Sequence, residues 1–187
     1  MAYLTAKALG EMGFKALGRN VKISDKASIY DADRITIGDY SRIDDFCVVS
    51  GRVEIGRNVH IAIFCNIAGG SEGVFIEDFS GIAYGSSVFS QSDDYTGEFL
   101  TGPTVPARFK RETKNAVRIG RHCIIGSGST VFPGVTLGEG TAVGAMTLVN
   151  KPTQAWSVYF GIPARRVGSR SQKLLELERE YLASGDP

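Results

Sequence analysis

Branched aliphatic residues return at every sixth position along much of this chain. The clearest run spans residues 119–150, where these positions are Ile119, Ile125, Val131, Leu137, Val143 and Val149. An α-helix repeats near 3.6 residues and a pleated strand repeats at two, so neither stays in phase with a period of six. Most of these aliphatic residues are followed by glycine, and the residues four places later are all compact. This spacing predicts short strands that alternate with tight corners.

The same phase occupies most of the remaining chain. Residues 37–67 contain six further aliphatic positions, and a shorter lead-in adds Ile23 and Ile29. A three-residue insertion then resets the count to Ile76, Ile82 and Val88. The pattern is absent from 91–118 and resumes at Ile119. The repeat therefore extends across the chain with one long interruption.

Three successive units of the repeat close one triangular coil. Each aliphatic side chain then points inward and stacks on its equivalent in the next coil, so neighbouring coils pair as parallel strands. A single coil cannot bury its own apolar side chains, which is why several must stack. Glycine after the aliphatic position permits the tight corner. The sequence predicts an all-β domain, a parallel β-helix over residues 21–167, with one extruded loop at 91–118.

The two flanks have helical patterns. Residues 1–20 are predicted as a helical cap with a short helix over 3–12, and residues 168–187 as a C-terminal helix that covers 169–183. Its predicted N-cap is Ser169 or Ser171. The predicted apolar face consists of Leu174, Leu177, Tyr181 and Leu182. Such helices are typical covers for coil ends or for a neighbouring subunit.

Composition excludes several classes of function. The chain has 187 residues with 21 basic and 20 acidic side chains, and this balance gives no electrostatic footprint for a nucleic acid polymer or an anionic membrane. No apolar run suits a signal peptide or a membrane span, so we expect a cytoplasmic protein. The cysteines, Cys47, Cys65 and Cys123, form no CxxC pair and occupy the compact position of the repeat. They are predicted to be buried thiols, and no metal site is expected.

The repeat, the single long loop and the segment 158-VYFGIPARRVGSR-170 together resemble the hexapeptide-repeat acyltransferases. The resemblance covers residues 23–167. It implies a left-handed β-helix, acetyl-CoA or another short acyl-CoA as co-substrate, and no metal. It also implies a homotrimer whose active sites are shared between neighbouring subunits, with the G-[IV]-P-A-[KR] segment closing the coenzyme A site.

Three other segments are similar to one subgroup of that family. They are MGFKALGRNVKISDKASIY, SRIDDFCVVSG and SQSDDYTGE, and they resemble the nucleotide-linked 4-amino-sugar N-acyltransferases of surface-polysaccharide (O-antigen) synthesis, such as those acting on dTDP-4-amino-4,6-dideoxyglucose. Galactoside and maltose O-acetyltransferases are more distant. The resemblance implies transfer of an acetyl or short acyl group to the amino group of a nucleotide-linked amino sugar. It leaves open which acyl group, nucleotide and sugar stereochemistry are used.

The extruded loop carries the candidate acceptor site. Acetyltransferases of the family usually supply a histidine there, whereas this loop has none and Asp93 takes the expected position. Asp93, Asp94 and Glu98 form an acidic group that would attract a protonated amine. A carboxylate could act as the base only if burial or mutual repulsion raised its pKa. Otherwise the group orients the amine, and the leaving thiolate or water takes the proton.

His60 is the second candidate for acceptor chemistry. It lies beside positions that bind the sugar in galactoside acetyltransferases, but this chain has Ala62 and Gly70 there. It could contact the acceptor, or serve as the base of the alternative function, a saccharide O-acetyltransferase. His122 is expected to be structural. The resemblance also implies a coenzyme A site. Its expected residues are Gly126, Ser127, Gly144, Ala145 and Lys151, and the guanidinium groups of Arg165 and Arg166 suit the nucleotide phosphates.

Two rival functions differ in class. A γ-type carbonic anhydrase shares the β-helix but needs three histidines around zinc, and this chain has only His60 and His122. A non-catalytic β-helix scaffold stays open from the sequence, although the GIPARR segment and the acidic loop argue against it. Binding of coenzyme A separates a scaffold from an enzyme.

Overall fold

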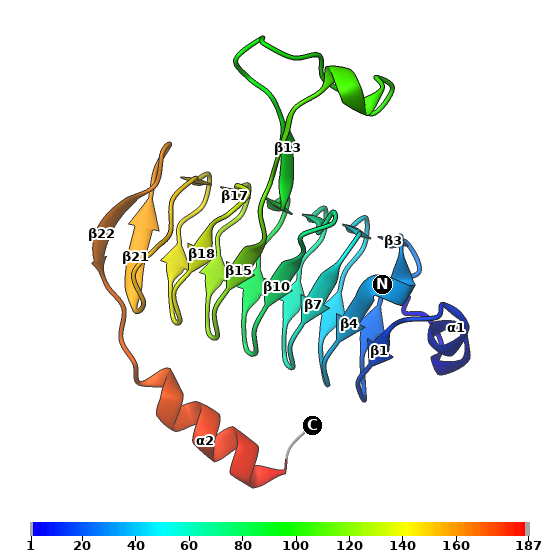
Figure 1. Cartoon of the computed structure of the whole chain (residues 1–187). Coiled ribbons are helices and arrows are strands. Elements are labelled where there is room, and N and C mark those ends of the chain that lie inside the picture. The colour runs from blue at the N-terminus through cyan, green and yellow to red at the C-terminus, as the bar shows by residue number, and fades with distance from the viewer. Residues whose placement is uncertain (1, 186–187) are drawn as a thin grey trace.

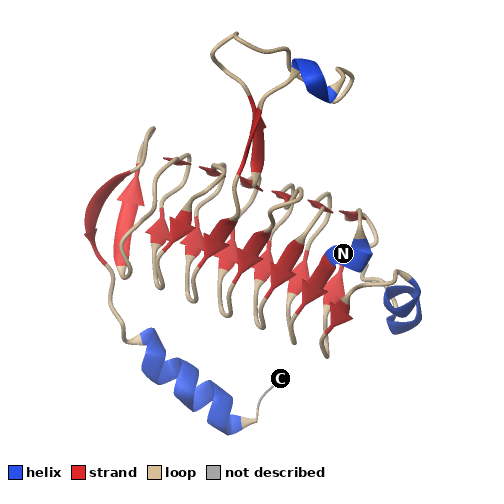
Figure 2. Cartoon of the chain, in the orientation of Figure 1, coloured by secondary structure: helices blue, strands red, loops and turns tan. Residues whose placement is uncertain are grey.

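The computed structural model describes residues 2–185 and shows a triangular stack of coils built from three parallel sheets (Figures 1 and 2). The first sheet contains β1 (Ala16–Leu17), β4 (Ile35–Ile37), β7 (Val53–Ile55), β10 (Val74–Ile76), β15 (Val117–Ile119) and β18 (Thr136–Leu137). The second contains β2 (Lys22–Ile23), β5 (Arg42–Ile43), β8 (His60–Ile61), β11 (Gly81–Ile82), β16 (Ile124–Ile125), β19 (Ala142–Val143), β21 (Ser157–Phe160) and β22 (Arg165–Ser169). The third contains β3 (Ser28–Ile29), β6 (Val48–Ser50), β9 (Asn66–Ala68), β12 (Ser87–Phe89), β17 (Thr130–Val131) and β20 (Leu148–Val149).

The six-residue pattern is confirmed by the register of the strands. Ile37 pairs with Ile55 one coil later, Ile55 with Ile76, and Ile76 with Ile119 across the long interruption. All the predicted aliphatic positions are buried except Ile29, which is half-buried in the first coil. The core is therefore a column of stacked aliphatic rows, and each coil buries its apolar side chains only because its neighbours cover them.

The predicted extruded loop is an antiparallel ribbon that ends in an irregular tip. Strand β13 (Gln91–Asp93) pairs with β14 (Glu112–Lys114), and the tip between them contains the short 3-10 helix η2 (Ala107–Phe109). Figure 1 shows the ribbon projecting from the side of the coils, opposite the C-terminal helix. The ribbon places Asp93 at the end of β13, where the tip begins.

The N-terminal cap is shorter than predicted. Helix α1 (Ala6–Glu11) starts after Thr5, whose Oγ1 accepts a hydrogen bond from the Ala8 N–H. Strand β1 falls inside the predicted cap but pairs in parallel with β4, so the coils begin before residue 21. A second 3-10 helix, η1 (Ala32–Arg34), precedes β4 and accounts for the spacing of eight residues, in place of six, between Ile29 and Ile37.

The start of the C-terminal helix was predicted wrongly. Residues 165–169 form β22, which folds back antiparallel on β21, so neither Ser169 nor Ser171 caps a helix. Helix α2 (Leu174–Ser184) begins after Lys173. Its predicted apolar face is also wrong in part, because Leu177 and Leu182 are exposed. Within residues 2–185, no helix has both the length and the apolar character needed to cross a membrane.

Candidate active site

Two of the three loop carboxylates accept hydrogen bonds from other residues of the loop. Asp93 is half-buried, and its Oδ2 accepts a hydrogen bond from the Gly102 N–H at 3.2 Å. Asp94 accepts from the Thr96 hydroxyl at 2.9 Å and from the Gly97 N–H at 3.0 Å. Glu98 is exposed, and no hydrogen bond or ion pair of the described residues uses its carboxylate. The three residues therefore share a loop but make no network with one another.

Asp94 stays ionised at neutral pH. Partial burial acts to raise the pKa of this carboxyl, but hydrogen bonds from Thr96, Gly97 and Phe99 outweigh it and lower the pKa below its usual value. A carboxylate with a lowered pKa is a poor proton acceptor and a good partner for a cation. Asp94 can therefore attract and orient an ammonium or amine group, and it is unsuited to act as a general base.

His60 is held by a buried aspartate that sequence reasoning missed. Its Nε2 lies 2.9 Å from Asp44 Oδ2, and the Asp44 side chain is only 4% exposed. Arg42 donates to both carboxylate oxygens, from Nε to Oδ1 at 2.5 Å and from Nη2 to Oδ2 at 3.1 Å. Burial acts to raise the pKa of Asp44, but the hydrogen bonds from Arg42 and His60 prevail and lower it. The available signal was the register, which sets Arg42 beside His60 one coil later.

His60 and the loop carboxylates do not meet within one chain. His60 lies on β8 in the second sheet, whereas Asp93 and Asp94 follow the third sheet through β12 and β13. None of the hydrogen bonds or ion pairs within residues 2–185 joins them. A site that uses both groups would have to form between two subunits.

The candidate donor positions line the corner between the second and third sheets. A Cβ at Gly126 would lie 2.5 Å from the Ala145 nitrogen, and one at Gly144 would lie 1.9 Å from the Phe160 ring. Glycine at position 126 is thus required by the close approach of the next coil's backbone, whereas at Gly144 it leaves room for the Phe160 ring, which would otherwise have to move. Among the described residues, the backbone N–H groups of Ser127 and Ala145 donate to no acceptor. They are available to the amide carbonyls of an extended ligand.

The candidate phosphate contacts lie on or near the terminal hairpin. Arg165 is exposed, and Arg166 is pinned by hydrogen bonds to Ser157 Oγ at 3.0 Å and Ser169 Oγ at 2.9 Å. Lys151 is exposed just after β20. The backbone of Leu148 in β20 bonds both Gly161 and Ala164 of the hairpin turn, so these cations gather at one end of the coils.

His122 and the cysteines are structural. His122 is buried, stacks on Phe79 at 5.4 Å between ring centroids, and binds Glu178 of α2. All three cysteines are free and buried, and burial raises the pKa of the Cys123 thiol to about 12. No group of three His, Cys, Asp or Glu side chains within residues 2–185 could hold a metal ion.

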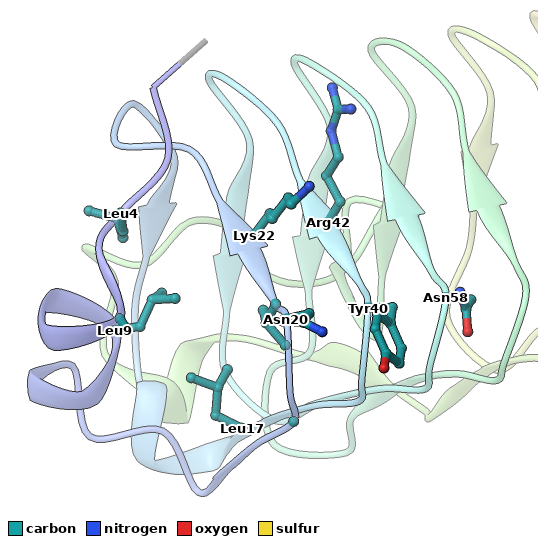
Figure 3. Close-up of a pocket in the computed structure, with 11 residues that line it drawn as sticks. Leu4, Leu9, Leu17, Asn20, Lys22, Tyr40, Arg42 and Asn58 are labelled. Atoms are coloured by element: carbon teal, nitrogen blue, oxygen red, sulfur yellow. The ribbon is translucent and has the colours of Figure 1, made fainter. Parts of the chain in front are cut away.

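A large hollow of about 730 Å³ lies between the N-terminal segment and the first coils (Figure 3). Leu4, Leu9 and Leu17 form its apolar side, and Asn20, Tyr40 and Asn58 stand in a row on successive coils. Lys22 and Arg42 add positive charge. No residue predicted as part of the site lines this hollow, although Arg42 joins it to the Asp44–His60 pair.

An exposed apolar stripe runs along the corner between the second and third sheets. We call it the corner stripe, and it consists of Phe46, Phe64, Tyr84 and Met146, which are 51–67% exposed. Phe46 and Phe64 stack with ring centroids 5.1 Å apart. A contiguous apolar strip on a protein surface is typical of an interaction site.

The chain is similar to a characterised group of sugar-modifying enzymes. No protein-family model matches it. It is 46% identical to the dTDP-4-amino-4,6-dideoxy-D-glucose acyltransferase of Escherichia coli, and the match covers 98% of this chain and 97% of that protein. AntD, an N-acyltransferase from Bacillus cereus in complex with dTDP and 3-hydroxybutyryl-CoA, is 42% identical over 97% of both chains, with a TM-score of 0.96.

Two further solved structures extend the comparison. A variant of AntD in complex with dTDP-4-amino-4,6-dideoxyglucose and coenzyme A also gives a TM-score of 0.96 at 42% identity, again over 97% of each chain. A maltose O-acetyltransferase from Clostridium difficile 630 gives a TM-score of 0.55 at 18% identity and covers 87% of this chain and 73% of that one. The similarity to the maltose O-acetyltransferase shows only that the two proteins share a fold.

Proposed function

The chain belongs to the hexapeptide-repeat acyltransferases, in the group of dTDP-4-amino-4,6-dideoxyglucose acyltransferases, and from this premise we propose its substrates and its reaction. It transfers a short acyl group from coenzyme A to the amino group of dTDP-4-amino-4,6-dideoxyglucose. The observation that carries the proposal is the 46% identity over nearly the whole length of both chains. The acidic loop without histidine supports an amine rather than a hydroxyl as the acceptor.

The donor lies along the corner of the later coils. The free N–H groups of Ser127 and Ala145 bind carbonyl oxygens of the pantetheine arm, which passes close to the backbone at Gly126 and Gly144. Arg165, Arg166 and Lys151 meet the phosphates at the hairpin end, where guanidinium groups suit anionic oxygens. The thioester then lies toward the coils that precede the loop.

The acceptor amine is placed by the loop carboxylates. Ionised Asp94 attracts the amino sugar, and Asp93 and Glu98 add negative charge on the same loop. The neutral amine nitrogen attacks the thioester carbonyl carbon, the C–S bond breaks, and the amide forms. Because Asp94 is unsuited as a base, the proton of the amine leaves with the thiolate or with water. An amine needs less help from a base than a sugar hydroxyl does.

The active site requires a neighbouring subunit, and we propose a homotrimer. The corner stripe supplies the apolar surface that a second copy would cover. Association along this corner sets the second sheet of one subunit, with His60, against the third sheet and loop of the next. Phe64→Asp places a charge in the middle of the stripe and should give monomers by light scattering. A Phe64→Asp variant that keeps the wild-type mass would contradict this interface.

The reaction is tested by thiol release from acyl-CoA. Wild-type protein is assayed with acetyl-CoA against nucleotide-linked amino sugars and matched hydroxy sugars. We expect turnover with dTDP-4-amino-4,6-dideoxyglucose and none with the 4-hydroxy analogue. Turnover only with hydroxyl acceptors would overturn the assignment, and no detectable binding of coenzyme A by calorimetry would favour a scaffold.

The acceptor role of Asp94 is tested by Asp94→Asn. The amide oxygen still accepts from Thr96 and Gly97, so the loop keeps its shape while the charge is lost. We expect kcat/KM for the amino sugar to fall by roughly tenfold or more, since charge-assisted hydrogen bonds are the strong ones. Binding of coenzyme A should not change. Asp33→Asn, an exposed aspartate of the first coils, is the matched control. Equal activity of the two variants would refute the role.

A further inference from the structure

A small hollow lies beside His60 on the outer face of the second sheet. It measures about 180 Å³ and opens over strands β8, β11 and β16. Its outer lining consists of His60, Ala62, Gly81, Ala83, Tyr84 and Ile124. Neither the loop carboxylates nor the donor glycines belong to it.

The hollow exists because Gly81 has no side chain. Gly81 pairs with His60 on one side and with Ile124 on the other, so a side chain here would fill the space between them. A Cβ at Gly81 would meet no atom within 4 Å, and its φ is not in the left-handed region. Gly126 and Gly144 differ, because a Cβ there would clash with the next coil. The fold does not require glycine at position 81, whereas the hollow does.

The lining suits a short aliphatic chain with one polar substituent. Ala62, Ala83 and Ile124 are aliphatic, and Tyr84 adds an aromatic wall. At about 180 Å³ the hollow has about a quarter of the volume of the hollow beside the N-terminal segment, which measures about 730 Å³. This is room for the tail of a short acyl group and too little for a sugar nucleotide.

His60 gives the hollow a hydrogen-bonding group. Ionised Asp44 can only accept, so Nε2 of His60 is the donor at their 2.9 Å contact. In the neutral form of the ring, Nδ1 is then an acceptor. A hydroxyl on the acyl chain can donate to it.

The hollow lies next to the proposed course of the coenzyme. Ile124 on β16 comes two residues before Gly126, where the pantetheine arm is expected to run. From there the hollow extends toward the N-terminal coils, in the direction in which the thioester points. Resting on the proposed function, we propose that this hollow receives the acyl chain of the thioester, limits its length, and recognises a 3-hydroxyl through His60.

The test fills the hollow without disturbing the coils. Gly81→Val places a branched side chain between His60 and Ile124, in a strand where valine is well tolerated. Gly10→Ala in α1, whose Cβ also meets no atom within 4 Å, is the control. Thermal unfolding of each variant checks the fold. Thiol release then gives kcat/KM for acetyl-, butyryl- and 3-hydroxybutyryl-CoA with dTDP-4-amino-4,6-dideoxyglucose, and calorimetry gives the Kd of each acyl-CoA.

We expect kcat/KM for butyryl-CoA to fall roughly tenfold or more relative to that for acetyl-CoA in Gly81→Val. His60→Leu should remove any preference for 3-hydroxybutyryl-CoA over butyryl-CoA. An unchanged ratio in Gly81→Val, an equal loss for all three donors, or a wild type that rejects butyryl-CoA overturns the proposal. If the wild type acylates no amino sugar, the proposed function fails, and the ratio of Kd values for butyryl- and acetyl-CoA still decides whether the hollow holds the acyl chain.

Discussion

The docking of helix α2 on the coils depends on one buried carboxylate. The Glu178 side chain is 9% exposed and pairs with Arg121 and with His122, whose Nε2 lies 2.9 Å from Oε2. His122 is 6% exposed and stacks on Phe79, which also contacts Tyr181 of α2 edge-on at 6.1 Å. Glu178→Ala removes the acceptor from a buried histidine and an arginine at once.

The cost follows from the burial of the pair. Removing the acceptor of a buried hydrogen bond costs about 1–3 kcal/mol, because the buried His122 donor is left unsatisfied, whereas Arg121 is 42% exposed and can turn to water. An isolated helix of 11 residues is marginal in water, so α2 should detach rather than unfold the coils with it. Since about 1.4 kcal/mol is a factor of ten, a loss of about 1–3 kcal/mol raises the opening equilibrium by roughly fivefold to a hundredfold.

Hydrogen exchange measured by mass spectrometry resolves this local effect. Peptides from 174–184 should lose protection in Glu178→Ala, while peptides from the coils keep theirs. Glu180→Ala is the control, because Glu180 is exposed on the same helix. Unchanged protection of 174–184 in Glu178→Ala would refute the view that this carboxylate holds the helix.

Two further predictions concern the coils. Gly144→Ala brings a Cβ within 1.9 Å of the Phe160 ring, so we expect the free energy of unfolding, measured in urea, to fall by about 1–3 kcal/mol. Gly168→Ala is the control and should leave the free energy of unfolding nearly unchanged, because a Cβ there meets no atom within 4 Å. Equal stability of the two variants would contradict the close approach at Gly144. The pKa of Asp44 is lower in the folded protein than in the unfolded chain, where it is about 3.9. The ionised carboxylate therefore stabilises the fold at pH values above the unfolded pKa, and this stabilisation is lost as the pH falls through the folded pKa. Asp44→Asn should therefore be less stable than the wild type at pH 6, and the difference should shrink below about pH 4; a difference that does not depend on pH would argue against the ionised pair.

The interior of the coils could be predicted because one physical rule governs it. Every sixth residue of the repeat points into the coil, so spacing alone identifies Ile37, Ile55 and Ile119 as core residues. The insertion after residue 67 and the extruded loop were visible for the same reason, as departures from the period. Cys47, Cys65 and Cys123 follow the rule too, since they occupy the compact inward position.

The exterior could not be predicted in this way, because no single rule governs it. The face by which α2 binds the coils uses Glu178 and Tyr181. The apolar pattern identified Tyr181, missed Glu178, and included Leu177 and Leu182, which are exposed. The pairing of Asp44 with His60 was missed, since the two are 16 residues apart and only the register of neighbouring coils brings them together. Helix α2 begins later than predicted because residues 165–169 pair with β21 as strand β22, a contact that the local sequence pattern does not indicate.

On the outer face of each sheet, equivalent side chains of successive coils are evenly spaced. This regular spacing relates the proposed acceptor site at the loop to the proposed acyl-chain hollow beside His60. Neighbouring strands lie about 4.8 Å apart, so His60, Gly81 and Ile124 mark a straight line of roughly 10 Å on the second sheet. An extended pantetheine arm beside Gly126 continues that line, and its acyl end reaches the hollow one coil farther on. In the proposed trimer, the amine approaches the thioester carbonyl from the open side of this line, where a neighbouring subunit places its loop. The two proposals together assign donor length and acceptor position to different subunits. Gly81→Val should therefore change acyl preference without changing KM for the sugar, and Asp94→Asn should change KM for the sugar without changing acyl preference.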